Sequence, residues 1–203
     1  MPIKDNREYR NLGAFDASGD YIVEGYASTF EPYEMMEIDG VKYYEKIDRH
    51  AFDEADMTDV VFLRDHTGRV LARTKNNSVE LSIDDHGLHQ RTNLGLTEAS
   101  RQMHEDIKVG NYSQMSFSFI VAEDHFDRDT RTRVVDRVAK VFDISAVGFP
   151  ANPNTDISAA TRAAFDGEIA RREAERLKEQ KARQERAKKE VELKLKLWEV
   201  EHD

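Results

Sequence analysis

Three residues whose side chains can together perform acyl transfer stand far apart in this chain. One of them is a serine in the segment GNYSQMSFSFIV. This segment has apolar residues at every second position, namely Met115, Phe117, Phe119 and Val121. Period two is typical of a β-strand with one face in a core. The other face carries two hydroxyls, Ser116 and Ser118. A solvent-facing edge strand would explain them simply, whereas a nucleophilic serine needs a base and an orienting group from elsewhere.

Among the seven histidines, His66 has the position that best suits a base. It ends the apolar run VVFLRDH just before Thr67 and Gly68, so the core fixes it from behind and a turn opens in front. The pattern places the others at a helix start, in a turn, on a strand face, on the polar side of a helix, near a hairpin tip and at the chain end: His50, His86, His89, His104, His125 and His202.

An acid stands inside the apolar strand VAKVFDISAVGF. A carboxylate there is costly unless it is hydrogen-bonded or paired. Asp143 should share one face with Val141 and Ser145. A histidine is one partner that would stabilise it; an ion pair with an arginine such as Arg137 is the simpler interpretation from the residues alone.

The amino-acid composition excludes several other kinds of functional site. The chain has no Cys, which excludes disulfides, thiolate metal sites and a cysteine nucleophile. The acid-rich segment DHFDRDTRTRVVD lacks the Gly and the final Glu of a calcium loop, and no His-x-x-x-His pair suggests zinc. We therefore expect neither a metal site nor a cofactor.

The net charge of −10 lies almost entirely before residue 161, because acidic and basic residues nearly balance after it. An acidic domain repels phosphate backbones, which argues against nucleic-acid partners. The apolar runs are too short to cross a membrane, and the start MPIKDNREYR lacks the apolar stretch of a secretory signal. We expect a soluble intracellular protein.

Strand patterns dominate from about Tyr21 to Asn154, with a hairpin turn near Asp127–Thr130 and a bend or close approach at Gly25. One helix is expected in EASRQMHEDIKV, capped by Thr97 and ended by Gly110. RHAFDEA gives a weaker indication of a second, short helix.

The composition changes after GFPANPNT. We divide the chain into a domain at 1–157, a linker at 158–167 and a charged helical tail at 168–203. The tail has a heptad spacing, but the middle of its seam is polar, so self-association would be weak there. A solvated single helix and a partner-binding helix both remain open, and Val191, Leu193, Leu195, Leu197 and Trp198 cluster near its end.

Three stretches together, VVFLRDHTG, GNYSQMSFSF and FDISAVGFPANPNT, resemble the prohead (capsid maturation) serine proteases of tailed bacteriophages, which share a fold with the herpesvirus assemblins. VEGYASTF, RHAF and DDHGLHQRTNL add to the resemblance, which covers about Tyr21 to Thr155. Two positions depart from the family pattern. Ser118 stands where the family commonly has Gly, and Asp143 stands where Glu is common.

The strand pattern and the resemblance imply an α+β fold: a small, mostly antiparallel β-barrel with surrounding helices, followed by the long charged helix. The resemblance implies a serine endopeptidase with Ser116 as nucleophile, His66 as base and Asp143 as the third member, and with no cofactor. Ser118 is the second candidate for the nucleophile. The implied substrates are the phage major capsid protein, scaffold segments and the protease itself, cut inside the assembling prohead in the host cytoplasm. A homo-oligomer remains open.

Two other functions are compatible with the sequence. A non-catalytic assembly protein could combine an inactive protease fold with a partner-binding helix. A hydrolase acting on carbohydrates or esters would need a small deep pocket, and the chain offers no aromatic sugar platform, since its one Trp is in the tail. Self-cleavage is expected in the segment ISAATRAAFDGE, and the donors of an oxyanion hole stay unassigned.

Overall fold

The computed structural model describes residues 7–17, 20–148 and 159–202. The chain divides into two compact units, Met1–Thr161 and Arg162–Asp203. None of the helices in these described ranges is long and apolar enough to span a membrane.

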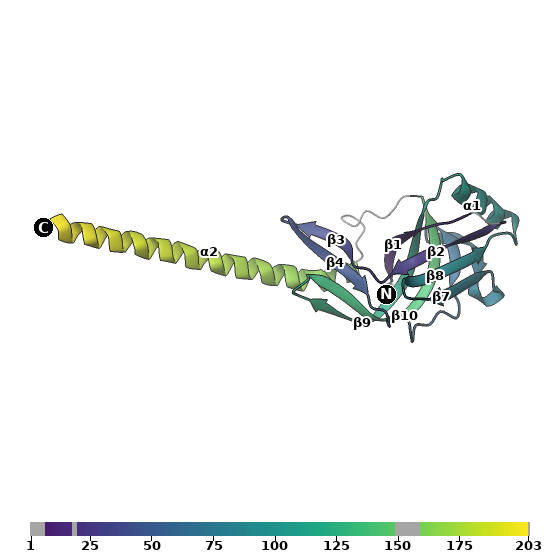
Figure 1. The fold of residues 1–203 in the computed structure, drawn as a ribbon, viewed down its shortest axis with the longest axis horizontal. Helices are drawn as coiled ribbons and strands as arrows, with labels where there is room; N and C mark the ends of the chain where they lie inside the picture. The colour runs from purple at the N-terminus through teal and green to yellow at the C-terminus, as the bar shows by residue number, and fades with distance from the viewer. Residues whose placement is uncertain (1–6, 18–19, 149–158, 203) are drawn as a thin grey trace, which may run out of the picture. The chain divides into compact units, whose positions relative to one another are not determined.

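Strands make up most of the first unit (Figure 1). In chain order the elements are β1 (Glu8–Ala14), β2 (Ile22–Thr29), β3 (Tyr33–Ile38), β4 (Val41–Ile47), β5 (Val61–Arg64), β6 (Thr67–Arg73), η1 (Thr74–Asn76), β7 (Val79–Ile83), β8 (Gly87–Asn93), α1 (Glu98–Lys108), β9 (Gln114–Asp127) and β10 (Thr132–Val147). The expected α+β class is confirmed.

The strands form two sheets. The seven-stranded sheet has the order β1-β9-β10-β4-β3, with β5 paired to β10 and β6 paired to β5, and the three-stranded sheet has the order β2-β8-β7. Among the strands of the described ranges, every pairing is antiparallel except those of β10 with β4 and with β5. A single bridge between Asp16 and Glu24 joins the chain after β1 to β2. No strand ladder among the described residues closes the sheets into a ring, so the expected barrel is not confirmed.

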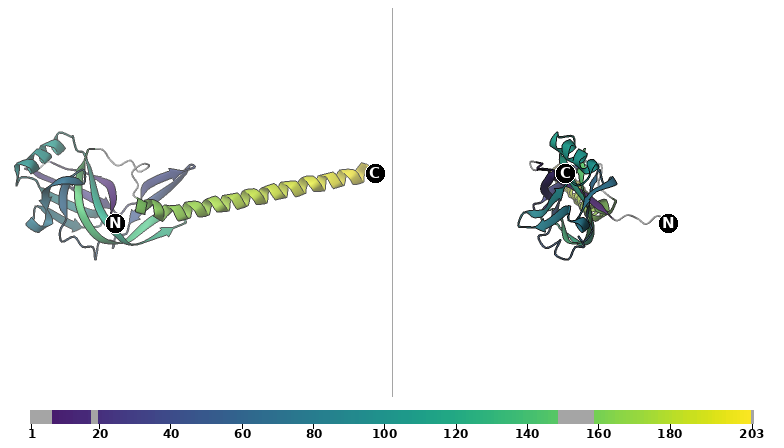
Figure 2. Two further views of the ribbon diagram at one scale, coloured as in Figure 1. Left: turned by 180° about the vertical axis from the view of Figure 1, so that it is seen from behind. Right: turned by 90° about the vertical axis from the view of Figure 1, so that its right-hand side faces the viewer.

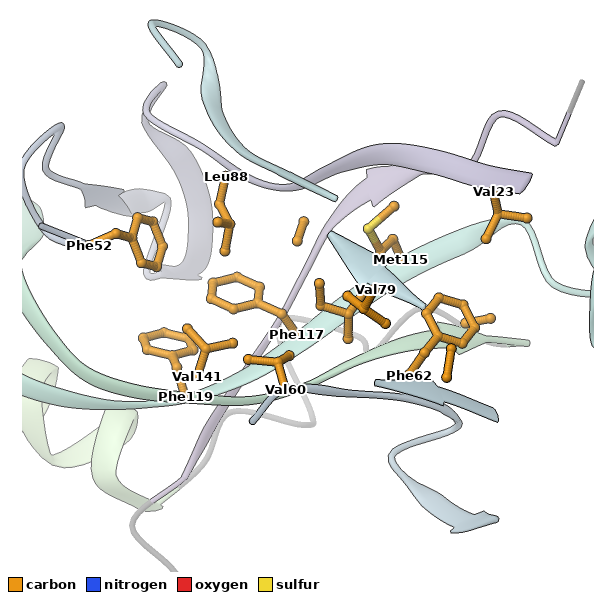
Figure 3. Packing of buried hydrophobic residues seen from close by; sticks show 14 of the residues in the cluster. Val23, Phe52, Val60, Phe62, Val79, Leu88, Met115, Phe117, Phe119 and Val141 are labelled. Carbon is orange, nitrogen blue, oxygen red and sulfur yellow. The ribbon is translucent and has the colours of Figure 1, made fainter. Parts of the chain in front are cut away.

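The core lies against one face of β9. Met115, Phe117 and Phe119 are fully buried, and the two phenylalanine rings stack at 4.6 Å between centroids. Figure 3 shows them among side chains from other segments, including Phe52 and Leu88. The period-two pattern therefore predicts this strand correctly, and its opposite face is left to Ser116 and Ser118.

A β-bulge in β10 sets the direction of the acid. Val141 pairs with Phe119 and Asp143 pairs with Ser118, so one extra residue of β10 is accommodated between the two pairs. Because cross-strand partners share a face, Val141 packs in the core and Asp143 points to the other side. The expectation that Val141 shares the face of Asp143 is wrong, since simple alternation cannot anticipate the extra residue.

Helix α1 begins and ends near the expected residues. The Thr97 hydroxyl accepts a hydrogen bond from Ser100 N–H at 3.1 Å, and Gly110 follows the helix with a φ of 86°. Figure 2 shows this teal helix at the periphery of the strands. His104, expected on its polar side, is 3% exposed and lies against the Tyr21 ring. That expectation is wrong because Tyr21 covers this side of α1.

The segment RHAFDEA forms consecutive turns and not the expected short helix. Its backbone N–H groups bond three residues back, as in Ala51 N–H to Asp48 O at 3.0 Å and Asp53 N–H to His50 O at 3.1 Å. An α-helix needs bonds four residues back. The burial of Ala51 and Phe52 anchors these turns on the core.

A buried ionic cluster joins β1 to β4 and β10. The sequence pattern did not single out β1 or β4 as strands. Arg10 contacts Glu8 at 2.6 Å and Glu45 at 2.7 Å, and Arg133 contacts the same two carboxylates at 2.7 and 2.8 Å. Burial raises the pKa of Glu8, but the Arg133 hydrogen bond and the charges of both arginines outweigh it and lower that pKa to about 2.

The helix α2 (Ala159–His202) begins three residues before the second unit and makes up nearly all of that unit. The helix begins before Glu168, so it includes most of the segment expected to be a linker. Four of the ten residues of that segment are alanine, the strongest helix former. Leu177 and Val191 are 52% and 58% exposed. The other apolar side chains of the expected docking cluster are not among the described side chains: Leu193, Leu195, Leu197 and Trp198. The PANPNT motif lies outside the described residues.

Candidate active site

The site lies on the face of β9 opposite the core. Strand register aligns two rows of residues across β5, β10, β9 and β1: Leu63, Ser145, Ser116 and Asn11 in one row, and Val61, Asp143, Ser118 and Tyr9 in the next. Ser116 is only 4% exposed. Because the side chains of β9 alternate between two faces, the Ser116 hydroxyl is held on the face opposite the core. The strand that carries it is paired on both sides, with β1 and with β10.

His66 reaches this face from the hairpin turn between β5 and β6. Arg64 and Thr67 pair across the hairpin, and the two residues between them, Asp65 and His66, have φ values of 48° and 55°. Two-residue hairpin turns favour positive φ at both positions, which suits Asn-Gly and strains a histidine. The sequence predicts the turn directly after His66, whereas His66 is itself in the turn.

Three hydrogen bonds fasten this turn to the end of β10. Asp65 N–H donates to Ala146 O at 2.9 Å, and the Asp65 carboxylate accepts from Gly148 N–H at 3.1 Å. His66 N–H donates to the Ser145 hydroxyl at 3.2 Å. The strained backbone is therefore held by β10, the strand that also carries the acid.

The three predicted residues converge. His66 Nε2 lies 2.7 Å from Ser116 Oγ, and His66 Nδ1 lies 2.6 Å from Asp143 Oδ1. In this arrangement the carboxylate accepts from Nδ1–H, which leaves Nε2 free of a proton and able to accept the serine proton. The connection is continuous from hydroxyl to imidazole to carboxylate.

The carboxylate of Asp143 is 2% exposed and well supplied with donors. Burial raises its pKa, but the hydrogen bond and charge of His66, together with the hydroxyls of Ser118 and Ser145, lower the pKa below its usual value. Asp143 is therefore ionised at neutral pH. The alternative ion pair with Arg137 is wrong, because Arg137 bonds Glu123 at 2.6 Å.

Ser118 faces the acid and not the imidazole. Its hydroxyl donates to Asp143 Oδ2, and the residue is fully buried. The serine that bonds the imidazole nitrogen is Ser116. The geometry gives no support to Ser118 as the second candidate for the nucleophile.

Tyr9 is a neighbour of the site that sequence reasoning missed. Its ring meets the His66 ring edge-on, with 4.7 Å between centroids and 70° between planes. The segment EYRNLGA does alternate, but its charged residues, Glu8 and Arg10, face inward to the ionic cluster. Because charged residues take the buried positions of this strand, a prediction based on hydrophobic alternation does not find it.

A hollow lies beside the turn, and none of Ser116, His66 and Asp143 lines it. Its volume is about 220 Å³, and it is bordered by Arg64 and Thr67 at the hairpin and by Gln102 and Asp106 of α1. No group of three or more His, Asp or Glu side chains in the described part of the chain is placed to hold a metal ion.

A serine, a histidine and an aspartate joined by hydrogen bonds in this order are the arrangement of hydrolases that act by acyl transfer through a serine. Comparison with known protein families identifies the family within this class. The model of the family described as caudovirus prohead serine protease matches residues 9–168. This chain belongs to that family, and the resemblance to phage capsid maturation proteases is confirmed. No curated protein and no solved structure matches the chain.

Proposed function

We propose that this protein is the endopeptidase that matures the phage prohead, with Ser116 as nucleophile, His66 as general base and Asp143 as the acid that orients it. Membership of the prohead protease family supports the reaction class. The observation that carries the assignment of residues is the continuous hydrogen-bond chain from Ser116 Oγ through both nitrogens of His66 to Asp143.

The reaction follows from this chain of bonds. Ser116 Oγ attacks the carbonyl carbon of a peptide bond while its proton passes to His66 Nε2. Asp143 holds the Nδ1–H tautomer and stabilises the imidazolium that forms. When the tetrahedral intermediate collapses, His66 returns the proton to the leaving amine. A water molecule, deprotonated by the same nitrogen, then hydrolyses the acyl-enzyme.

The proposed substrates are the major capsid protein, scaffold segments and the protease itself, inside the assembling prohead in the host cytoplasm. The family description supports a prohead substrate. Self-cleavage is proposed within residues 157–168. Because α2 begins at Ala159, cleavage there would require the first turns of the helix to open into an extended strand.

A barrel remains our proposal for the finer architecture. The Asp16–Glu24 bridge supports it, since it joins the two sheets by hydrogen bonds of 2.8 and 2.9 Å. The chains also approach closely nearby: a Cβ added to Gly13 would lie 2.0 Å from Tyr26 O, and one added to Gly25 would lie 2.4 Å from Ala14 O. The expected close approach at Gly25 is confirmed.

We assign the charged helix to recruitment and not to chemistry. Charges such as the Arg171–Glu175 pair at 2.6 Å keep its surface hydrated, while the exposed Leu177 and Val191 are available to a partner. The competing idea of an inactive fold used for assembly is disfavoured, because Ser116, His66 and Asp143 are joined by hydrogen bonds.

The test is cleavage by the purified protein. Incubation with its capsid and scaffold proteins, followed by mass measurement of the fragments, should show cleavage by the wild type and none by Ser116→Ala. Ser82→Ala, an exposed serine of β7, is the matched control and should cleave at the wild-type rate. Cleavage by Ser116→Ala at the wild-type rate would overturn the assignment.

A further inference from the structure

We infer that Ser118 is a positioning residue of this active site, and that its hydroxyl and the length of the acid at position 143 form a matched pair. The inference rests on the proposed function. Ser118 does not touch the substrate in this account. It acts by holding Asp143 in the orientation and charge state that His66 requires.

The two oxygens of Asp143 have different partners. Oδ1 accepts from His66 at 2.6 Å and from the Ser145 hydroxyl at 2.7 Å. Oδ2 accepts from the Ser118 hydroxyl. Because Ser118 is fully buried and Asp143 is 2% exposed, water cannot readily replace that donor. Without the hydroxyl, a buried carboxylate oxygen would lose a donor and the carboxylate could turn away from His66.

The strand register explains why one short acid can serve both partners. Ser118 and Asp143 are direct partners in the β9–β10 ladder, next to the bulge that turns Asp143 to this face. A glutamate at 143 would be longer by one methylene and would carry its carboxylate toward the space that Ser118 Oγ occupies. A glycine at 118 would leave that space open.

Ser118 and Asp143 are in direct contact, so the lengths of their side chains are coupled. The Ser118 hydroxyl fills the space beside the short acid and donates to its second oxygen.

The positioning role of Ser118 affects the protonation of the Asp143–His66 pair. The Ser118 hydrogen bond stabilises the ionised form of Asp143, so its loss favours the protonated carboxyl. Catalysis requires Asp143 ionised and His66 neutral at once. The pair should therefore retain its proton to higher pH in Ser118→Ala, and the acidic limb of kcat/KM should move to higher pH. A residue that only supports the fold would lower activity without moving that limb.

The test compares five full-length variants on one peptide substrate: Ser118→Ala, Ser118→Gly, Asp143→Glu, the double variant Ser118→Gly/Asp143→Glu, and the control Ser82→Ala. We expect each of the first three to lose about ten- to hundredfold in kcat/KM, mostly in kcat. The double variant should recover at least about tenfold over the weaker single variant, and Ser82→Ala should match the wild type.

Two results would overturn the inference: wild-type activity in Ser118→Ala, or a loss without a shifted acidic limb and without recovery in the double variant. If Asp143→Glu fails to fold, the pH profile of Ser118→Ala still decides. Failure of the proposed function is separate, because it would appear as activity in Ser116→Ala.

Discussion

Replacing Asp143 by Asn keeps the size of the side chain and removes its charge, so this variant isolates what the carboxylate does for His66. In the wild type the two oxygens accept from His66, Ser118 and Ser145. An amide has one oxygen and one NH₂ group, so it cannot accept on both sides. With the NH₂ group toward Nδ1, the imidazole must carry its proton on Nε2.

That tautomer cannot accept a proton from Ser116, which lies 2.7 Å from Nε2. We expect Asp143→Asn to lower kcat by about 10³- to 10⁴-fold, the size of effect known for the same change in other serine triads. Substrate binding should change little, because the carboxylate is buried behind the imidazole.

The assay is single-turnover cleavage of a capsid-derived peptide, with circular dichroism to show that the variant is folded. Asp136→Asn is the matched control. Asp136 is on the same strand and pairs with His125 at 2.7 Å, but the side chains of His125 and Asp136 are 58% and 38% exposed. Its loss should change kcat by about twofold or less. A folded Asp143→Asn that keeps more than about a tenth of wild-type activity would refute the orienting role.

Three further predictions concern stability, cofactors and the tail. Since the pKa of Glu8 is lowered from 4.5 to about 2 in the folded protein, the stability it contributes is present above about pH 4.5 and lost as pH falls toward 2. Acid titration of the unfolding free energy should show a loss of about 3 kcal/mol there, absent in Glu8→Gln; equal profiles would contradict it. A chelator should leave peptide cleavage unchanged, because the nucleophile is a serine; loss restored by a divalent ion would oppose the mechanism. A chain ending at Ala160 should cleave a coat peptide and fail to enter proheads; normal packaging of that chain would contradict the recruitment role.

The central strand and the convergence of Ser116, His66 and Asp143 could be predicted because their local signals agree with their final environment. The alternation around Ser116 matches a strand with one buried face. His66 follows an apolar run, and a buried acid at 143 demands a polar partner. These signals depend on residues adjacent in the chain, and the family motifs link them to one another.

What the sequence could not supply depends on contacts between distant segments. The strand β1 is hidden because Glu8 and Arg10 pair with residues of other strands inside the unit. The bulge that separates Val141 from Asp143 appears only in the pairing with β9. His104 is buried by Tyr21, a residue that α1 itself does not contain.

The most direct test of the account is covalent labelling with a fluorophosphonate, which reacts with a serine only when that serine is activated as a nucleophile. Mass spectrometry of the digested protein should place one adduct on Ser116. Labelling should be abolished in Ser116→Ala and strongly slowed in His66→Ala. An adduct on Ser118 or on any other serine, or full cleavage activity after complete labelling of Ser116, would contradict the claim that Ser116 carries the reaction.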